Sequence, residues 1–110
     1  MDLYPPVVRE ALARFPLGSQ ESLGDQAQVV VKYFFPAGRY TLYVTEGEKE
    51  GTDVRLFGYC VSALGEDCDE WGYVMLSELQ GLRVRGLTME RDLSFPIATR
   101  TVADALARAA

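Results

Sequence analysis

Two charged residues fall on strand faces that are otherwise apolar, and they are the first candidates for chemistry. In the predicted strand 39–46, alternation places Glu46 on the face of Leu42 and Val44. In the predicted strand 89–95, the same alternation places Arg91 on the face that holds the apolar residues of that strand. A charge on an apolar face is costly unless it is paired. The pattern therefore predicts that Arg91 pairs with Glu46 or another acid at the rim of the sheet.

A polar pocket beside that rim is the alternative to a simple ion pair. Tyr43, Tyr59 and Trp71 lie on neighbouring predicted strands, with Tyr73 close by. Aromatic side chains on half-buried strands serve packing more often than recognition. Both interpretations stay open, and the pocket makes these aromatic residues candidate binding residues.

The residue types exclude several kinds of chemistry. The chain has no histidine, so triads and zinc sites that depend on imidazole are impossible within it. The two cysteines, Cys60 and Cys68, are too few for a disulfide framework or a four-cysteine zinc site. There is no glycine-rich phosphate loop and no calcium loop. The sequence predicts no catalytic residue, no metal and no cofactor.

The net charge of −5 is concentrated in one segment. Residues 46–70 hold eight acids and two bases, a balance of −6, whereas the other residues hold eight acids and nine bases, a balance of +1. The densest parts, EGEKEGTD and GEDCDE, read as loops. This charge opposes binding to phosphate backbones. It indicates either ordinary solvation of two loops or a surface that mimics nucleic acid or docks a basic partner.

The elements that must position these residues form an α+β pattern. Apolar residues at helical spacing predict an N-terminal helix near 5–14, a short helix near 77–82 and a C-terminal helix over 101–109. Strand patterns cover 27–35, 39–46, 54–61, 71–76 and 89–95. Short links favour an antiparallel meander, since parallel neighbours need long crossovers. We expect a single antiparallel β-sheet of four to five strands with helices on one face.

Length and hydropathy set the remaining bounds. A chain of 110 residues suits one domain, 1–110. Its longest uncharged stretch, residues 56–65, is too short for a membrane span, which needs about 20 apolar residues. The start of the chain lacks the pattern of a signal peptide, so the expected location is the cytoplasm.

The order of several segments resembles the DUF2958 family, a small bacterial domain of unknown function. The resemblance covers about residues 16–96 and rests on YVTEG, FGYC, GYVMLSEL and MERDLSF in that order. It implies an association with mobile genetic elements and implies no activity. The recurrent charged positions of the family correspond here to Glu46, Glu78, Glu90, Arg91 and Asp92. The acidic GEDCDE segment departs from the family pattern.

Three function classes follow. The first is a non-enzymatic binding or accessory module that recognises a protein partner rather than nucleic acid or a membrane. The second is an acidic DNA mimic of the antirestriction type, motivated by residues 46–70. The third is a carboxylate-dependent hydrolase using Glu46 with Glu90 or Asp92, although strand parity puts Glu46 and Asp92 on opposite faces. The oligomeric state stays open.

Overall fold

The centre of the protein is a five-stranded antiparallel sheet. A computed structural model describes residues 1–109 and gives the strand order β5-β4-β3-β2-β8. The strands are β2 (Val31–Phe34), β3 (Thr41–Glu50), β4 (Asp53–Val61), β5 (Glu70–Met75) and β8 (Glu90–Arg91). The predicted α+β class and the meander of the first four strands are confirmed, because β2, β3, β4 and β5 pair in chain order.

The predicted strand 27–35 is divided in two at Val30. Its first part, β1 (Gln28–Val29), pairs with β9 (Arg100–Thr101) in a small second sheet. Its second part is β2, which lies between β3 and β8. The predicted strand 89–95 is reduced to β8, because Asp92–Ser94 form a turn in which the Asp92 side chain accepts hydrogen bonds from Ser94.

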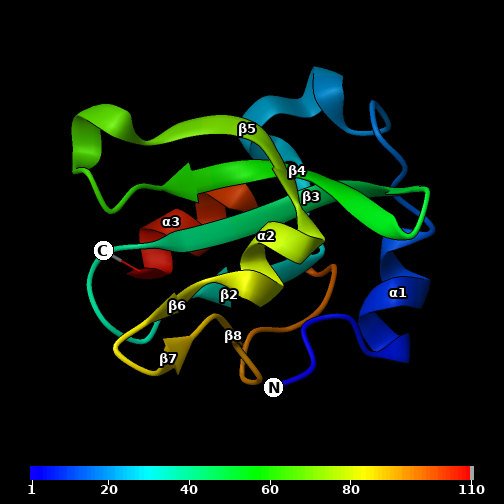
Figure 1. Ribbon diagram of the computed structural model, residues 1–110. Helices are drawn as coiled ribbons and strands as arrows, with labels where there is room; N and C mark the ends of the chain where they lie inside the picture. The colour runs from blue at the N-terminus through cyan, green and yellow to red at the C-terminus, as the bar shows by residue number, and fades with distance from the viewer. Residues whose placement is uncertain (110) are drawn as a thin grey trace.

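Helices cover both faces of the sheet, not one face as the sequence suggested (Figure 1). On one face, α1 (Pro6–Leu12) and α2 (Leu76–Gly81) contribute Val8, Leu12 and Leu79 to a core with Leu42 and Leu56. We call this the α1 face. On the other, the α3 face, α3 (Val102–Ala109) packs on Val29, Tyr43 and Phe95. Thr101 caps the start of α3, since Asp104 N–H donates to Thr101 Oγ1.

The remaining elements are short. Two 3-10 helices, η1 (Glu21–Gln26) and η2 (Glu66–Cys68), lie in the loops before β1 and before β5. The strands β6 (Arg83–Val84) and β7 (Leu87–Thr88) form a hairpin whose turn residues Arg85 and Gly86 both have positive φ, as two-residue hairpin turns require. In the described part of the chain, no helix has the length and apolarity needed to cross a membrane.

A β-bulge in β3 decides which face each later residue takes. Val44 lies opposite Gly58 and Glu46 lies opposite Phe57, so Thr45 is an extra residue without a partner on β4. Because residues directly opposite share a face, Glu46 lies on the α3 face with Phe57. The prediction that Glu46 shares the face of Leu42 and Val44 is wrong, since simple alternation does not allow for the added residue.

Glycine at position 58 permits the close approach at this bulge. A Cβ atom on Gly58 would lie 2.1 Å from the carbonyl oxygen of Tyr43, closer than packed atoms come. The opposite residue on β5, Gly72, has no atom within 4 Å of such a Cβ. The backbone of β3 therefore occupies the space that a side chain of residue 58 would need.

The first acidic segment is a strand and a tight turn rather than a loop. β3 continues to Glu50, and the turn at Gly51–Thr52 leads directly into β4. The second acidic segment does lie in a connection, around η2. Since β4 runs between them, the two segments lie at opposite ends of the sheet, as the meander predicts (Figure 1).

Candidate binding face

Four aromatic side chains form a contiguous row on the α3 face of β4 and β5. We call Phe57, Tyr59, Trp71 and Tyr73 the aromatic platform. The Phe57 and Trp71 rings stack with centroids 5.7 Å apart and an interplanar angle of 17°. Tyr73 approaches Phe57 at 4.8 Å, and Tyr59 meets Trp71 edge-on at 5.6 Å. The row results from strand alternation, because Phe57 pairs with Tyr73 and Tyr59 with Trp71.

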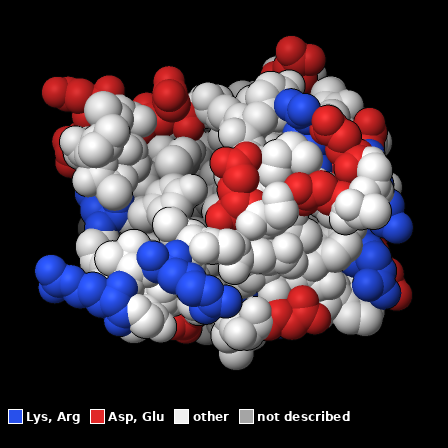
Figure 2. Space-filling model, in the orientation of Figure 1, with Lys and Arg blue, Asp and Glu red and all other residues white. Residues whose placement is uncertain are grey.

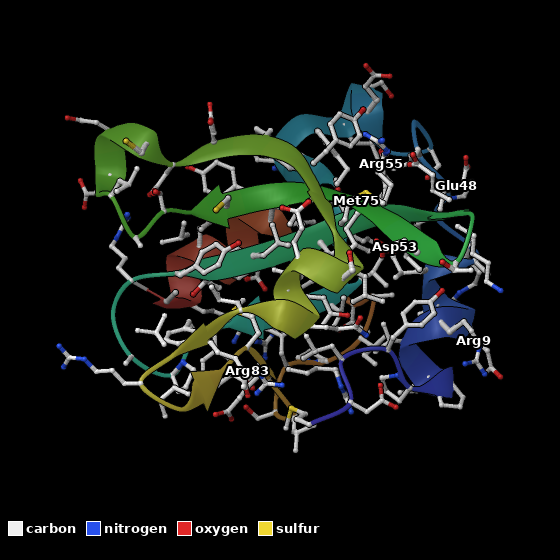
Figure 3. All side chains as sticks on the ribbon, in the orientation of Figure 1. Arg9, Glu48, Asp53, Arg55, Met75 and Arg83 are labelled. Atoms are coloured by element: carbon white, nitrogen blue, oxygen red, sulfur yellow. The ribbon has the colours of Figure 1, made fainter. Side chains whose placement is uncertain are left out.

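One end of the platform is covered by α3, and the other end is open. Tyr59 and Trp71 pack against the cluster that includes Val102 and Ala105 of α3. Tyr73 is 63% exposed, and Phe57 and Trp71 are partly exposed. At the open end, the Arg55 guanidinium lies 5.7 Å from the Tyr73 ring centroid. Figure 3 shows Arg55 beside Met75, its partner on β5.

Next to the platform, Glu46 is a buried carboxylate held by backbone amides. It is 3% exposed. Its Oε1 accepts a hydrogen bond from Gly18 N–H at 2.7 Å, and its Oε2 accepts one from Gln20 N–H at 2.8 Å. No lysine or arginine in the described residues forms an ion pair with it. Glu46 thus fixes the loop before η1 onto the sheet.

Gln20 completes this attachment. Its side chain is 5% exposed and donates to the carbonyl oxygens of Gln28 and Thr45 at 2.9 and 2.8 Å, while its oxygen accepts from Gln28 N–H at 2.7 Å. The bulge leaves the Thr45 carbonyl available for this bond. A buried amide with all these partners holds the loop in one position.

Between the loop and the platform lies a pocket of about 150 Å³, which we call the Glu46 pocket. Its wall combines two carboxylate residues, two aromatic rings and three uncharged residues: Glu21, Glu46, Phe57, Trp71, Gln20, Gly24 and Thr45. No basic residue lines it. The pocket exists because the bulge turns Glu46 toward Phe57 and Trp71.

The other candidate binding residues are distributed over three places. Tyr43 is buried under α3, where Lys32 lies 5.6 Å from its ring centroid and pairs with Asp92 at 3.3 Å. Glu90 is on the same face at the far edge of the sheet, opposite Phe34. Glu78 lies in the first turn of α2 above the α1 face and accepts a hydrogen bond from Met75 N–H at 3.2 Å. The structure brings together Glu46, Tyr59 and Trp71, with Tyr43 directly opposite Tyr59 on β3. Glu78, Glu90 and Asp92 lie apart from them.

Arg91 does not pair with Glu46. It lies on β8 opposite Tyr33, and β2 separates it from β3. Tyr33 in turn lies opposite Leu42, so Arg91 is level with Leu42, which is four residues before Glu46 on β3. The Arg91 and Glu46 side chains therefore leave the sheet on opposite faces, more than about 10 Å apart. Burial raises the pKa of the Tyr33 hydroxyl, and the charge of Arg91 partly offsets that rise. The Nε of Arg91 is buried without a hydrogen-bond partner among the described atoms.

Asp92 has a charge partner of its own. Burial raises the pKa of the Asp92 carboxyl, but hydrogen bonds from Ser94 and Lys32 outweigh it, so the pKa lies below its ordinary value. Asp92 and Glu46 share the α3 face after the bulge is taken into account, yet Asp92 lies beside Lys32, two strands away from Glu46. Each carboxylate is engaged with a different partner.

Two of the other cavities are more than twice as large as the Glu46 pocket. One of about 420 Å³ lies between α1, the β3–β4 turn and α2, near Arg9, Lys49 and Asp53 (Figure 3). There the hydrogen bond from Ser77 lowers the pKa of the Asp53 carboxyl, so this acid already has its partners. The other, of about 330 Å³, lies beside Cys60 and Glu78, and burial raises the pKa of the Cys60 thiol. Neither combines a buried charge with aromatic walls.

Within residues 1–109, no three acidic or cysteine side chains come together closely enough to hold a metal ion. In the dense segment 66–70, Asp69 is engaged by Arg39 at 2.5 Å. That hydrogen-bonded pair holds the pKa of the Asp69 carboxyl below its ordinary value.

The fold and this face define a small α+β protein built on an antiparallel sheet, with a half-covered aromatic surface on one side. The chain belongs to the DUF2958 family of proteins of unknown function, whose sequence profile matches residues 3–110. No curated protein and no solved structure matches the chain significantly. The family match extends beyond the resemblance at 16–96 and includes both terminal helices.

Sequence reasoning missed four residues of the Glu46 pocket that matter to its shape. The sequence contains a signal for Phe57, because its alternation with Tyr59 in the run LFGYC places the two rings on one face. The sequence contains no such signal for Thr45 or Gln20. The unpaired position of Thr45 in the strand and the burial of the Gln20 amide in a loop cannot be distinguished from those of other polar residues by sequence alone. Glu21 is exposed in η1 and becomes part of the pocket only through the folding of the loop.

Proposed function

We propose that this protein is a non-catalytic binding module that holds an extended segment of a protein partner along β5 and the aromatic platform. The observation that carries the proposal is an open sheet edge beside exposed aromatic rings. Among residues 1–109, β5 pairs only with β4. Its outer side therefore presents backbone donors and acceptors to an added strand. Side chains of that strand would meet Tyr73 and Trp71 on the α3 face.

The composition of the platform suits a partner protein. Aromatic residues are enriched at the centres of protein interfaces, where they provide large contact areas. Figure 2 views the molecule from the α1 face and shows acidic side chains around the half that holds β3, β4 and β5. On the opposite, α3 face, Glu21 and Glu46 line the pocket beside the platform and Glu48 lies opposite Arg55. An acidic surface around the platform opposes nucleic acid and favours a basic segment of protein.

The two alternative functions have less support. A hydrolase with paired carboxylates needs them within about 10 Å of each other. Glu90 lies on β8 and Asp92 directly after it, so β2 separates both from Glu46 on β3, and Glu46 and Asp92 have separate partners. A DNA mimic needs a continuous acidic stripe. Here the eight acids of residues 46–70 lie at two ends of the sheet, Glu46 is buried, and Glu50 and Asp69 pair with arginines.

The cellular setting belongs to the same proposal. The resemblance to DUF2958 implies a bacterial accessory protein of mobile elements, and we place the module in the cytoplasm. A partner encoded on the same element is the natural candidate for the extended segment.

A peptide-display library panned against the immobilised full chain tests the proposal. We expect to recover peptides that bind the Tyr73→Ala variant at least about tenfold more weakly than they bind the wild type, the loss typical of an aromatic interface anchor. Leu93→Ala is the matched control, because Leu93 is 68% exposed and far from β5, and it should leave affinity unchanged. Peptides that bind both variants equally, or the recovery of no binding peptide, would contradict the proposal.

A further inference from the structure

The Glu46 carboxylate is buried, and none of residues 1–109 forms an ion pair with it. Each carboxylate oxygen accepts one backbone bond, from Gly18 or Gln20. Each oxygen has capacity for a second bond. Buried charges are ordinarily paired as well as hydrogen-bonded. Lys32, a base on the same face of the neighbouring strand, is paired with Asp92.

The walls of the Glu46 pocket are suited to a cation. Phe57 and Trp71 line it, and the faces of aromatic rings attract positive charge. Glu21 adds a second carboxylate at the exposed rim. The same platform already accepts a guanidinium at its open end, where Arg55 lies over Tyr73. The pocket therefore combines carboxylate side chains with aromatic rings in its wall.

We infer that the Glu46 pocket receives the cationic end of an arginine or lysine side chain from the protein partner. The inference rests on the proposed function, since it identifies the residue that the bound segment must contain. A volume of about 150 Å³ equals the liquid volume of roughly five water molecules, enough for a guanidinium or ammonium group with its last methylene groups. A free anion or an apolar side chain would leave Glu46 without a counter-charge.

The surroundings of the pocket favour the same partner. Residues 46–70 carry a net charge of −6. Arg55, the base nearest the open end of the platform, is paired with Glu50 at 2.5 Å. A basic segment lying along β5 would be attracted by the field of this half of the molecule before its cationic side chain enters the pocket.

Titration of the full chain with three blocked tripeptides tests the inference. The probes are acetyl-Gly-Arg-Gly-amide, its lysine analogue and its norleucine analogue, at constant ionic strength. Trp71 is the single tryptophan, so its indole N–H signal and its fluorescence both report on the pocket. We expect the arginine and lysine probes to shift the Trp71 indole and Gly24 amide signals with millimolar affinity, and the norleucine probe to shift neither. The arginine and lysine arms show which cation the pocket prefers.

Variants separate binding in the pocket from general attraction to an acidic surface. Glu46→Gln should weaken the cationic probes about tenfold, the loss expected for one charge-assisted contact. Glu21→Gln, an exposed change that keeps the fold, should weaken them about threefold. Glu48→Gln is the matched control, because it removes the same charge from an exposed position of β3 outside the pocket, and it should change affinity little.

Three results would overturn the inference. They are equal shifts with norleucine, equal losses for Glu21→Gln and Glu48→Gln, or no shift at Trp71 with any probe. If display peptides bind through Tyr73 but retain affinity when their basic residues are replaced, the inference fails and the proposed function stands. If the tripeptides bind at Trp71 while no display peptide depends on Tyr73, the proposed function fails instead.

Discussion

The two faces of the central sheet are built from the same strands but use them differently. On the α1 face, α1 and α2 seal an apolar core in which Val44 and Leu56 are fully buried. On the α3 face, a single helix covers one end of the sheet and leaves Phe57 and Tyr73 partly or largely exposed. Here the bulge also places a buried carboxylate beside aromatic rings. The comparison separates a face that stabilises the fold from a face available for binding.

The bulge creates this difference, and breaking it should have the largest effect. Gly58→Ala would put a methyl group 2.1 Å from the Tyr43 carbonyl oxygen. The backbone of β3 must then move, and we expect a loss above about 4 kcal/mol in the free energy of unfolding. Urea denaturation measures it. Gly72→Ala, opposite on β5 and free of contacts, should cost less than about 1 kcal/mol, and equal losses for the two variants would disprove the close approach.

Removing the buried carboxylate should have the next largest effect. Glu46→Ala leaves the amides of Gly18 and Gln20 buried without acceptors. We expect a loss of about 2–4 kcal/mol in the free energy of unfolding. Glu48→Ala on the exposed end of β3 is the control and should stay within about 0.5 kcal/mol of the wild type. A loss for Glu46→Ala as small as that of the control would mean that the carboxylate is solvated.

Neighbouring residues on β4 compare the two faces directly. Leu56 points into the α1 core and is fully buried, whereas Phe57 belongs to the platform and is partly exposed. We expect Leu56→Ala to cost about 3 kcal/mol and Phe57→Ala about 1–2 kcal/mol, as measured by thermal or urea unfolding. If Phe57→Ala proved the more costly, the platform would be part of the core rather than an open surface.

The separation of Arg91 from Glu46 predicts that their effects add. In a double-mutant cycle with alanine at both positions, the coupling free energy should be below about 0.5 kcal/mol, as for sites without shared partners. Urea unfolding of the four proteins measures it. Coupling above about 1 kcal/mol would show the ion pair that strand alternation suggested.

The smallest effect concerns two partly buried acids, one at each end of the sheet. Hydrogen bonds from Ser77 and from Arg39 hold the pKa values of Asp53 and Asp69 below the unfolded value. A lowered folded-state pKa stabilises the protein above the unfolded pKa of about 3.9, and that stabilisation is lost as the pH falls through the folded value. In acid titrations followed by circular dichroism, Asp69→Asn should lose stability less steeply than the wild type below about pH 4. Identical acid profiles would contradict this.

The sequence was sufficient for the elements that obey a simple period. The strands of the meander and the capped helix after Thr101 follow alternation or helical spacing, so their place in the fold could be predicted. The run from Gln28 to Phe34 is extended as alternation predicts, but its division at Val30 between two sheets leaves no mark on that pattern. The acidic end of β3 has no apolar alternation at Glu48, Lys49 and Glu50, so the sequence predicts a loop there. That end is exposed on both sides, so no core pattern marks it.

The binding face could be predicted only in part. Tyr59 and Trp71 follow from alternation on adjacent strands. The position of Glu46 does not, because it depends on one unpaired residue, Thr45, and on the space left by Gly58. The charge of Arg91 was placed on the correct face but given the wrong partner, since the sequence does not reveal that β2 lies between β3 and β8.

The placement of Glu46 on the α3 face is the central claim, and nuclear Overhauser effects in the folded protein test it most directly. The structure predicts contacts from the Glu46 methylene protons to the ring protons of Phe57 and Trp71, which line the same pocket. It also predicts slow hydrogen exchange at the Gly18 and Gln20 amides, which the carboxylate holds. Contacts from Glu46 to the methyl groups of Leu12 or Leu56 would instead put the carboxylate on the α1 face and contradict the bulge, the pocket and the inference built on them.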